Sequence, residues 1–309
     1  MVSTEVPLGD VLSRVRVDPA ACRAVVADEE VEAPRRGELE PRLAERIYAV
    51  FHAGLSTDPA DKAQLKRDRP LEQVLAGVVP HARTPVTGVL RRDDRDRLLV
   101  ELSGVLVWLP REALDGDPVP ADEPVRLLLP PVRPCLSPGF QFVTGSRAPD
   151  FTGPPLRVYV HVADPGSAPG VWRAVLTALE AADVAYQAKV LARSGQYPRR
   201  DALVVYLPAD HTGAARLVAA AVRELPGIGP ETSVFAERIA PGVATAWEPV
   251  DTRFGLSGLS FGQHRSRVLA KALLDAAETG QPPEEAIVPA FRAARIDPAN
   301  PARNLGQDG

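Results

Sequence analysis

Alternation of apolar and polar residues in the second half of the chain predicts a β-sheet. In the segment Leu156–Val162 the valines fall on one face, whereas Arg157, Tyr159 and His161 fall on the other. This two-residue period is typical of a strand that packs on a core by one side only. The polar side is therefore available for chemistry.

Two more strands are expected in this half of the chain, at Val184–Leu191 and Asp201–Leu207. In the first of them, Gln187 and Lys189 share one face. The sequence thus predicts a second strand that carries polar side chains on the face where a site could form.

Apolar residues at helical spacing predict helices over residues 171–182 and 210–225, and a further strand is expected at Ser233–Ile239. The resulting order β-α-β-β-α-β predicts an α+β sandwich with helices on one face of the sheet and a polar opposite face. A helical segment that starts at Ser260 is expected to complete this half of the chain.

The first part of the chain has a different pattern. Residues 1–85 are expected to form a helical region, because apolar residues recur at helical spacing through 43–55. We divide the chain into this helical N-terminal region and an α+β domain over 86–309.

The α+β domain is expected to open with a small β-meander. Two apolar runs, 87–90 and 97–109, flank a turn-like charged stretch at 93–96. Proline-rich segments at 117–124 and 130–138 are interpreted as connectors.

Composition narrows the class of protein. The chain has 309 residues, 45% of them hydrophobic, and a formal net charge of −4, which weakens a nucleic-acid or membrane-surface interpretation. The N-terminus leads into no apolar stretch of signal-peptide length, so a cytoplasmic protein is expected. Cys22 and Cys135 lie far apart and have no metal-binding spacing.

The pentapeptide Gly258–Gly262 matches the G-x-S-x-G pattern of hydrolases, but no His follows at the distance that a catalytic triad needs. The better interpretation is a capping box, with Ser260 at the N-cap and Gln263 three residues later. A helix that begins there directs free backbone N–H groups and a positive dipole end at its surroundings.

His264, Arg265 and Arg267 lie in the first two turns of this helix. Cations near a helix N-terminus are unfavourable for the helix alone, so their presence indicates a bound anion. The alternative is that the two arginines pair with surface carboxylates.

Lys189 lies inside an apolar strand, although lysine is rare in this chain. An ammonium group that is partly removed from water favours its neutral form, which can act as a base. The alternative is a strand-edge lysine whose charged end extends to solvent.

Arg199, Arg200 and Asp201 lie at the start of the third strand of the predicted sandwich. A pair of arginines with a carboxylate can bind phosphate, with the carboxylate orienting one guanidinium. A solvated turn is the alternative. Tyr206 and His161 could donate protons, although each can also be an ordinary sheet residue with a satisfied polar end.

The motifs of several enzyme classes are missing. The sequence contains no P-loop, no G-x-G-x-x-G after a strand, no H-E-x-x-H and no kinase catalytic loop. The sequence therefore has no motif that indicates nucleotide, NAD, zinc or kinase chemistry.

Four blocks of sequence, taken in this order, resemble the HopA-type effector family. The blocks are Arg157-Val158-Tyr159, Gln187–Leu191, Arg199–Tyr206 and Ser260–Arg267. The family includes type III effectors of plant pathogens and the lyase component of class V lanthipeptide and thioamitide biosynthesis. The resemblance covers roughly residues 86–309. His161 stands where family members often carry Asn, and Arg200 is not part of the family pattern.

The resemblance implies a phosphothreonine/phosphoserine lyase that removes phosphate from a precursor peptide by β-elimination, leaving dehydrobutyrine or dehydroalanine. It also implies a separate Ser/Thr kinase that phosphorylates the precursor, and no metal or organic cofactor. Lys189 would be the base, with His264 or Tyr206 as the acid. The residues expected to bind phosphate and substrate are Arg199, Arg265, Arg267, Arg157, Tyr159, Gln187 and Asp201.

Two other classes of function stay open at this point. The chain could be a non-catalytic phosphopeptide-binding module, or an effector that acts by binding a protein. The N-terminal region 1–85 could dock the kinase or the precursor leader peptide, or it could be a structural cover of the lyase domain.

Overall fold

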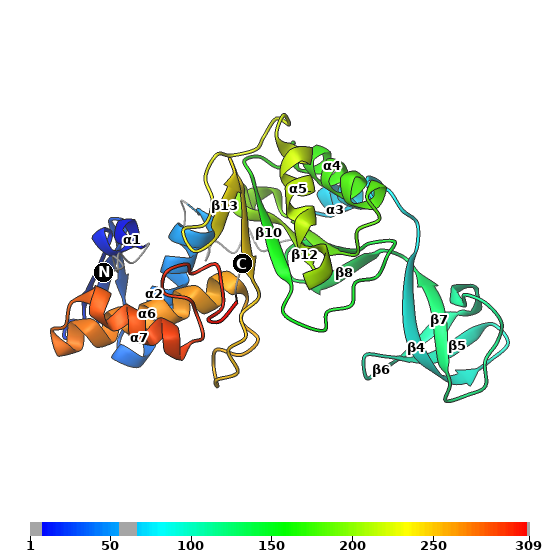
Figure 1. Ribbon diagram of the computed structural model, residues 1–309, viewed down its shortest axis with the longest axis horizontal. Coiled ribbons are helices and arrows are strands. Elements are labelled where there is room, and N and C mark those ends of the chain that lie inside the picture. Colours follow the sequence, from blue (N-terminus) through cyan, green and yellow to red (C-terminus); the bar gives the residue numbers. More distant parts are fainter. Residues whose placement is uncertain (1–7, 56–66, 308–309) are drawn as a thin grey trace.

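The computed structural model describes residues 8–55 and 67–307, and these form three antiparallel sheets with flanking helices (Figure 1). The predicted α+β class is confirmed. The four-stranded sheet lies at one end of the molecule, and the three-stranded sheet with α6 and α7 lies at the other.

A seven-stranded sheet forms the centre of the protein. Its strand order is β13-β14-β10-β12-β11-β9-β8, with every neighbouring pair antiparallel. The strands are β8 (Val132–Ser137), β9 (Phe140–Thr144), β10 (Leu156–Val162), β11 (Gln187–Leu191), β12 (Arg199–Leu207), β13 (Glu237–Ala240) and β14 (Val243–Trp247).

This sheet contains the predicted β-α-β-β-α-β order and extends it. The proline-rich segment 130–138, interpreted as a connector, contains the edge strand β8, where an edge position tolerates Pro134. The strand expected at Ser233–Ile239 begins at Glu237 instead, and β14 was not anticipated. Its sequence, Val-Ala-Thr-Ala-Trp, holds two alanines and so gives a weak strand signal.

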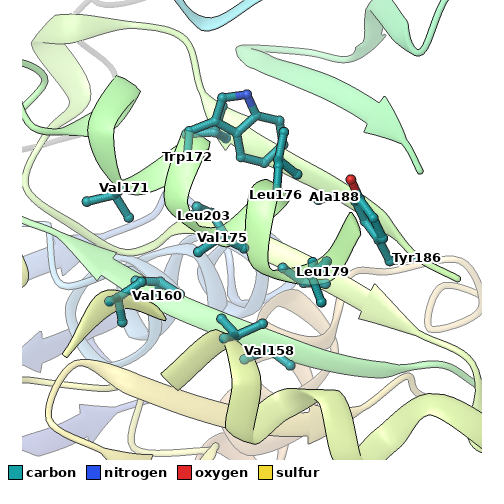
Figure 2. Packing of buried hydrophobic residues seen from close by; sticks show 14 of the residues in the cluster. Val158, Val160, Val171, Trp172, Val175, Leu176, Leu179, Tyr186, Ala188 and Leu203 are labelled. Atoms are coloured by element: carbon teal, nitrogen blue, oxygen red, sulfur yellow. The ribbon is translucent and has the colours of Figure 1, made fainter. Parts of the chain in front are cut away.

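Helices α4 (Ala168–Ala181) and α5 (Ala215–Val222) cover one face of the seven-stranded sheet. Trp172 and its neighbours on α4 pack on Val158, Val160, Ala188 and Leu203 from three strands (Figure 2). All these side chains are fully buried, so this face is an ordinary hydrophobic core. Helix α3 (Arg69–Gly77) adds Leu75 to the same core.

The opposite face of the sheet meets a second core built mainly on helix α6 (Phe261–Thr279). Tyr159, Val204 and Ala246 from the sheet join Phe261 and apolar residues of the N-terminal region in this core. The other elements of this part are α1 (Gly9–Ser13), β1 (Val15–Asp18), β2 (Arg23–Val26), β3 (Glu29–Glu32), α2 (Arg36–Ile47) and α7 (Pro283–Ala293).

The N-terminal region is therefore helical only in part. Strands β1, β2 and β3 form a small antiparallel sheet in it, which the helical expectation did not include. Helix α2 passes into a π-helical segment, Tyr48–Ala53, that ends at Gly54 with a positive φ of 73°. π-helical turns often occur at functional sites because they change the direction in which side chains point.

The predicted meander is present as a four-stranded sheet of order β6-β5-β4-β7. Its strands are β4 (Thr84–Asp93), β5 (Arg97–Leu102), β6 (Val105–Pro110) and β7 (Pro124–Leu129). The run 97–109 is two strands joined at Ser103-Gly104, both of which have positive φ. The apolar residues of this sheet form a small hydrophobic core of their own.

Short helical turns link these elements. In residues 8–55 and 67–307 these include the 3₁₀ turns Arg111–Ala113, Ser194–Gln196 and Ala209–Ala214.

Candidate active site

The register of three central strands brings most of the predicted site residues onto one face. Gln187 on β11 pairs with Tyr206 on β12, which pairs with Arg157 on β10. Two positions along, Lys189 pairs with Val204, which pairs with Tyr159. Side chains at these positions point away from α4 and α5, because the alternate residues of the same strands fill the helix-covered core.

Lys189 is half-buried and lies against aromatic rings. Its Nζ is 4.5 Å from the centre of the Phe140 ring and 6.0 Å from that of Tyr206. Within the described residues this ammonium group makes no hydrogen bond or ion pair. Ring faces attract a cation without occupying its N–H groups, so the amine is held in place yet available to a substrate.

Arg199 and Asp201 form a buried ion pair at the start of β12. The guanidinium binds both carboxylate oxygens, at 2.6 and 3.0 Å, and donates to the Tyr48 hydroxyl at 2.8 Å. Burial alone would raise the pKa of Asp201, but the charge and hydrogen bonds of Arg199 outweigh burial and hold that pKa well below its usual range. The predicted orienting role of Asp201 matches this geometry.

Phe140 connects this ion pair with the lysine. The Cζ atom of Arg199 is 5.6 Å from the centre of the same ring that Lys189 contacts. Phe140 was not among the predicted site residues, although Phe140-Gln141-Phe142 alternates as a strand does.

Tyr48 and His52 were also missed, since the N-terminal region showed no chemical motif. Tyr48 donates to Asp201 at 3.0 Å, and the Nδ1 atom of His52 lies 2.8 Å from the Ser233 hydroxyl oxygen. Burial lowers the pKa of His52 to about 4, so the imidazole is neutral near pH 7. The signal that could have found both residues is their i, i+4 spacing on one helix face.

A cavity of about 290 Å³ adjoins the Arg199–Asp201 pair. Arg199, Tyr48, Arg267 and Gln263 line it, together with Pro41, Ala44, Glu45, Leu55, Gln196 and Leu259. Gln263 belongs to the capping box at the start of α6, whose presence is confirmed, and its Oε1 accepts from the Ser260 backbone N–H at 3.1 Å. We call this space the arginine cavity. It joins two predicted phosphate ligands to a helix N-terminus.

Arg267 already has one partner in this structure. Its Nε lies 3.3 Å from Glu40, and both side chains are partly exposed. Exposed pairs of this kind contribute roughly 0–1 kcal/mol, so an incoming dianion can replace the carboxylate at little cost.

Arg157 and Tyr206 lie together on the polar face. Arg157 pairs with Glu248, and its guanidinium carbon is 5.0 Å from the centre of the Tyr206 ring. Tyr206 is half-buried, and its hydroxyl has no hydrogen-bond partner within the described residues. The hydroxyl can therefore donate to a substrate.

Tyr159 is enclosed beneath this face. Its hydroxyl is buried and lacks a hydrogen-bond partner among the described residues. Burial raises the pKa of Tyr159 above its ordinary value, so the phenol stays protonated. Its ring packs 6.0 Å from Phe261 and edge-on to His52.

His264 and Arg265 lie behind the polar face, in a fully buried network. The Nε2 atom of His264 is 3.0 Å from Asp251 and its Nδ1 is 2.8 Å from an Arg265 nitrogen. Arg265 also donates to the carbonyl oxygen of Pro301 at 2.8 Å. Burial lowers the pKa of His264 to about 4 and that of Arg265 to about 9. Arg265 thus holds the C-terminal segment on α6, and His264 links Arg265 to Asp251.

The structure therefore divides the predicted residues into three groups. Gln187, Lys189, Tyr206 and Arg157 share the polar face, and Arg199, Asp201 and Arg267 surround or adjoin the arginine cavity. Tyr159, His264 and Arg265 are enclosed behind them.

His161, a candidate proton donor, and Arg200, one of the arginine pair considered for phosphate binding, contact other parts of the protein. His161 Nδ1 lies 3.2 Å from the Glu231 side chain. Arg200 donates to the carbonyl oxygen of Val50 at 3.2 Å.

Comparison with known proteins identifies the family. Residues 132–303 match the model of the HopA1 effector protein family, and the chain belongs to this family. The matched segment begins at β8 and includes the whole seven-stranded sheet and α6.

Two solved structures are similar to this chain. One is an effector protein from Pseudomonas syringae pv. tomato strain DC3000, with 15% identity, a TM-score of 0.50 and coverage of 89% of this chain and 91% of that one. The other is an effector protein from Pseudomonas syringae pv. syringae strain 61, with 16% identity, a TM-score of 0.48 and coverage of 84% and 89%. At these identities the likeness concerns the fold. Comparison with curated proteins gives no significant match.

Two further observations concern the described residues alone. No helix among them is long and apolar enough to span a bilayer. In the same part of the chain, no group of three or more His, Cys, Asp or Glu side chains is arranged to hold a metal ion.

Proposed function

We propose that the protein is a phosphothreonine/phosphoserine lyase that converts a phosphorylated precursor peptide into one containing dehydrobutyrine or dehydroalanine. The supporting observation is the position of Lys189, an amine with no hydrogen-bond or ion-pair partner in the described residues. It shares the Phe140 ring with Arg199, which lines the arginine cavity. Base and anion site are thus adjacent, as β-elimination of phosphate requires.

The reaction begins with removal of a proton. Lys189 acts as the base and takes the proton from Cα of the phosphorylated residue, and the electron pair of that C–H bond forms the Cα=Cβ double bond. The Cβ–O bond breaks, and its electron pair leaves with the phosphate. No water is added, and no oxidant or reductant is needed.

The arginine cavity would hold the leaving group. Arg199 and Arg267 supply positive charge, and the first turn of α6 supplies backbone N–H groups and the positive end of its dipole. These groups stabilise the phosphate most strongly as negative charge builds up on it. They therefore stabilise the transition state more than the bound substrate, and this lowers the barrier.

Tyr206 is the better of the two candidates for the acid. Its hydroxyl lies on the polar face without a partner in the described residues, whereas His264 is fully buried with both ring nitrogens engaged. Tyr206 would protonate the departing oxygen, and Gln187 and Arg157 beside it would position the peptide.

The proposal places the protein downstream of a separate Ser/Thr kinase in the cytoplasm, within lanthipeptide-type biosynthesis. No metal or organic cofactor takes part. Membership of an effector family favours a second candidate, a non-catalytic protein that binds phosphopeptides or host proteins. The same arginine cavity would serve such binding.

Product analysis separates these functions. The protein is incubated with a phosphothreonine peptide, and the products are followed by mass spectrometry and by thiol addition to the alkene. The lyase predicts loss of phosphoric acid and a thiol-reactive product. A regenerated threonine means a phosphatase, and binding without turnover supports the second candidate.

The matched controls are Lys189→Ala and Arg216→Glu. Arg216 is exposed on α5, on the far side of the sheet from the polar face. The first variant is expected to be inactive and the second fully active.

A further inference from the structure

A second cavity lies between the four-stranded and the seven-stranded sheets. Its volume is about 670 Å³, larger than that of the arginine cavity. Fifteen residues line it: Pro85, Val86, Thr87, Leu102, Ser103, Arg126, Arg133, Leu136, Phe142, Thr144, Ser146, Arg147, Ala148, Pro149 and Gln187. We call it the inter-sheet groove.

The groove continues the face that carries Lys189. Gln187 lines the groove and precedes Lys189 by two residues on β11, which corresponds to roughly 7 Å along the strand. Phe142, another lining residue, is the direct β9 partner of Lys189. On the opposite side of Lys189, Phe140 leads to the arginine cavity. Lys189 therefore lies between the two cavities.

The groove is positively charged at its walls. Arg126, Arg133 and Arg147 line it, and none of its lining residues is acidic. Arg133 is half-buried on β8 and makes no hydrogen bond or ion pair within the described residues. The absence of a carboxylate partner leaves this guanidinium available to a ligand.

The other two arginines are exposed, and each has a carboxylate partner that a ligand can replace. Arg126 lies 2.9 Å from Asp115, and Arg147 lies 3.1 Å from Asp183. Pairs at this exposure are weak. Leu136 adds an apolar side chain that is 61% exposed in the groove lining.

From this arrangement we infer that the inter-sheet groove binds an acidic segment of the substrate peptide, at least about two residues from the phosphorylated one. The inference rests on the proposed function, because it takes the occupant of the arginine cavity to be part of the same peptide. Cationic walls with no acidic lining fit Asp and Glu side chains, and a groove open between two sheets fits an extended chain. The site would select acidic precursors and fix which residue reaches Lys189.

The test uses three fluorescent phosphothreonine peptides with the full-length protein. One is short and has no charged side chain besides the phosphothreonine, and we call it the neutral peptide. The other two carry the same core with four glutamates placed two residues before or after the phosphothreonine. Affinity is measured by anisotropy and turnover by mass spectrometry. One glutamate peptide is expected to bind about tenfold more tightly than the neutral one, and this gain should shrink as salt is raised.

Charge reversal locates the site. Arg133→Glu should remove the gain of the glutamate peptide while leaving binding of the neutral peptide unchanged. The milder pair Arg126→Gln with Arg133→Gln guards against misfolding, and Arg216→Glu is the matched control. If neither glutamate peptide gains affinity, or if the gain survives both groove variants, the inference is overturned.

Failure of the inference differs from failure of the proposed function. Equal affinity for all three peptides, with elimination from each, overturns the groove assignment and keeps the lyase. A gain that depends on Arg133, without any elimination, keeps the acidic-peptide site and sinks the lyase. If a short RNA displaces the glutamate peptide as effectively as unlabelled peptide does, the groove does not select peptides and the inference fails.

Discussion

The two faces of the seven-stranded sheet are built by alternate residues of the same strands, yet they differ in almost every property. Under α4 and α5 lie Val158, Val190 and Leu203, all fully buried and apolar. One residue away lie Arg157, Lys189 and Val204, two of them charged. Packing explains the first face completely.

The second face has charged groups that packing does not require. Partly buried charges reduce stability unless they are paired, and within the described residues Lys189 is not paired. Proteins keep such groups at sites where function needs them. Under the proposed function, the difference between the faces therefore places stability on one and chemistry on the other.

The neighbours Lys189 and Val190 give the sharpest test of this division. Lys189→Ala should lower the elimination rate by about 10²–10⁴-fold, the contribution typical of a general base, with little change in stability. Val190→Ala should lower the free energy of unfolding by about 2 kcal/mol and leave the elimination rate per folded molecule unchanged. Single-turnover kinetics and denaturant unfolding measure both. An inactive Val190→Ala that remains folded would break the comparison.

The Arg199–Asp201 pair is expected to contribute both to stability and to phosphate binding. Arg199→Ala leaves a buried carboxylate without its cation, which is expected to cost about 3–5 kcal/mol of stability. Tyr48→Phe removes the hydrogen bond to Asp201 and the one accepted from Arg199, and should cost only about 2 kcal/mol. Urea unfolding of both variants tests this order. Equal small effects would show that the ion pair contributes little.

The sequence predicted the helix-covered face better than the site. Alternation in β10, β11 and β12 gave the strands and their polar face, because a two-residue period is a local property. The contact of Tyr48 with Asp201 joins residues 153 positions apart, and no local pattern encodes it. The burial of His264 and Arg265 likewise depends on the C-terminal segment, so their charge suggested an accessible anion site that the fold encloses.

A glycine at the start of α6 controls how closely the N-terminal region approaches the site. A Cβ atom on Gly262 would lie 2.2 Å from the Cδ2 atom of His52. Gly262→Ala should therefore destabilise the protein by about 1–3 kcal/mol and reduce phosphopeptide affinity, since α6 and the π-helical segment must separate. The matched control is Gly170→Ala on α4, where nothing lies within 4 Å. Equal thermal unfolding of the two variants would contradict the close packing.

Acid should weaken the protein through two of its buried histidines, His52 and His264. In the folded state the pKa values of His52 and His264 are lowered to about 4, whereas the unfolded chain titrates them near their ordinary value. Between pH 6.5 and 4 the unfolded state binds more protons, so stability falls as pH falls through this window and is constant above it. From pH 7.5 to 5 the expected loss is on the order of 2 kcal/mol per histidine. Urea unfolding at both pH values measures this loss, and unchanged stability would contradict neutral burial.

Chemical rescue at position 189 tests most directly whether this amine is the base. Lys189→Cys should be inactive toward a phosphothreonine peptide while still binding it. Alkylation with bromoethylamine then restores an amine of nearly the same length, and elimination should return to a substantial fraction of the wild-type rate, with alkylated wild-type protein as the control for Cys22 and Cys135. An active Lys189→Cys, or an alkylated variant that binds peptide but stays inactive, would contradict the account.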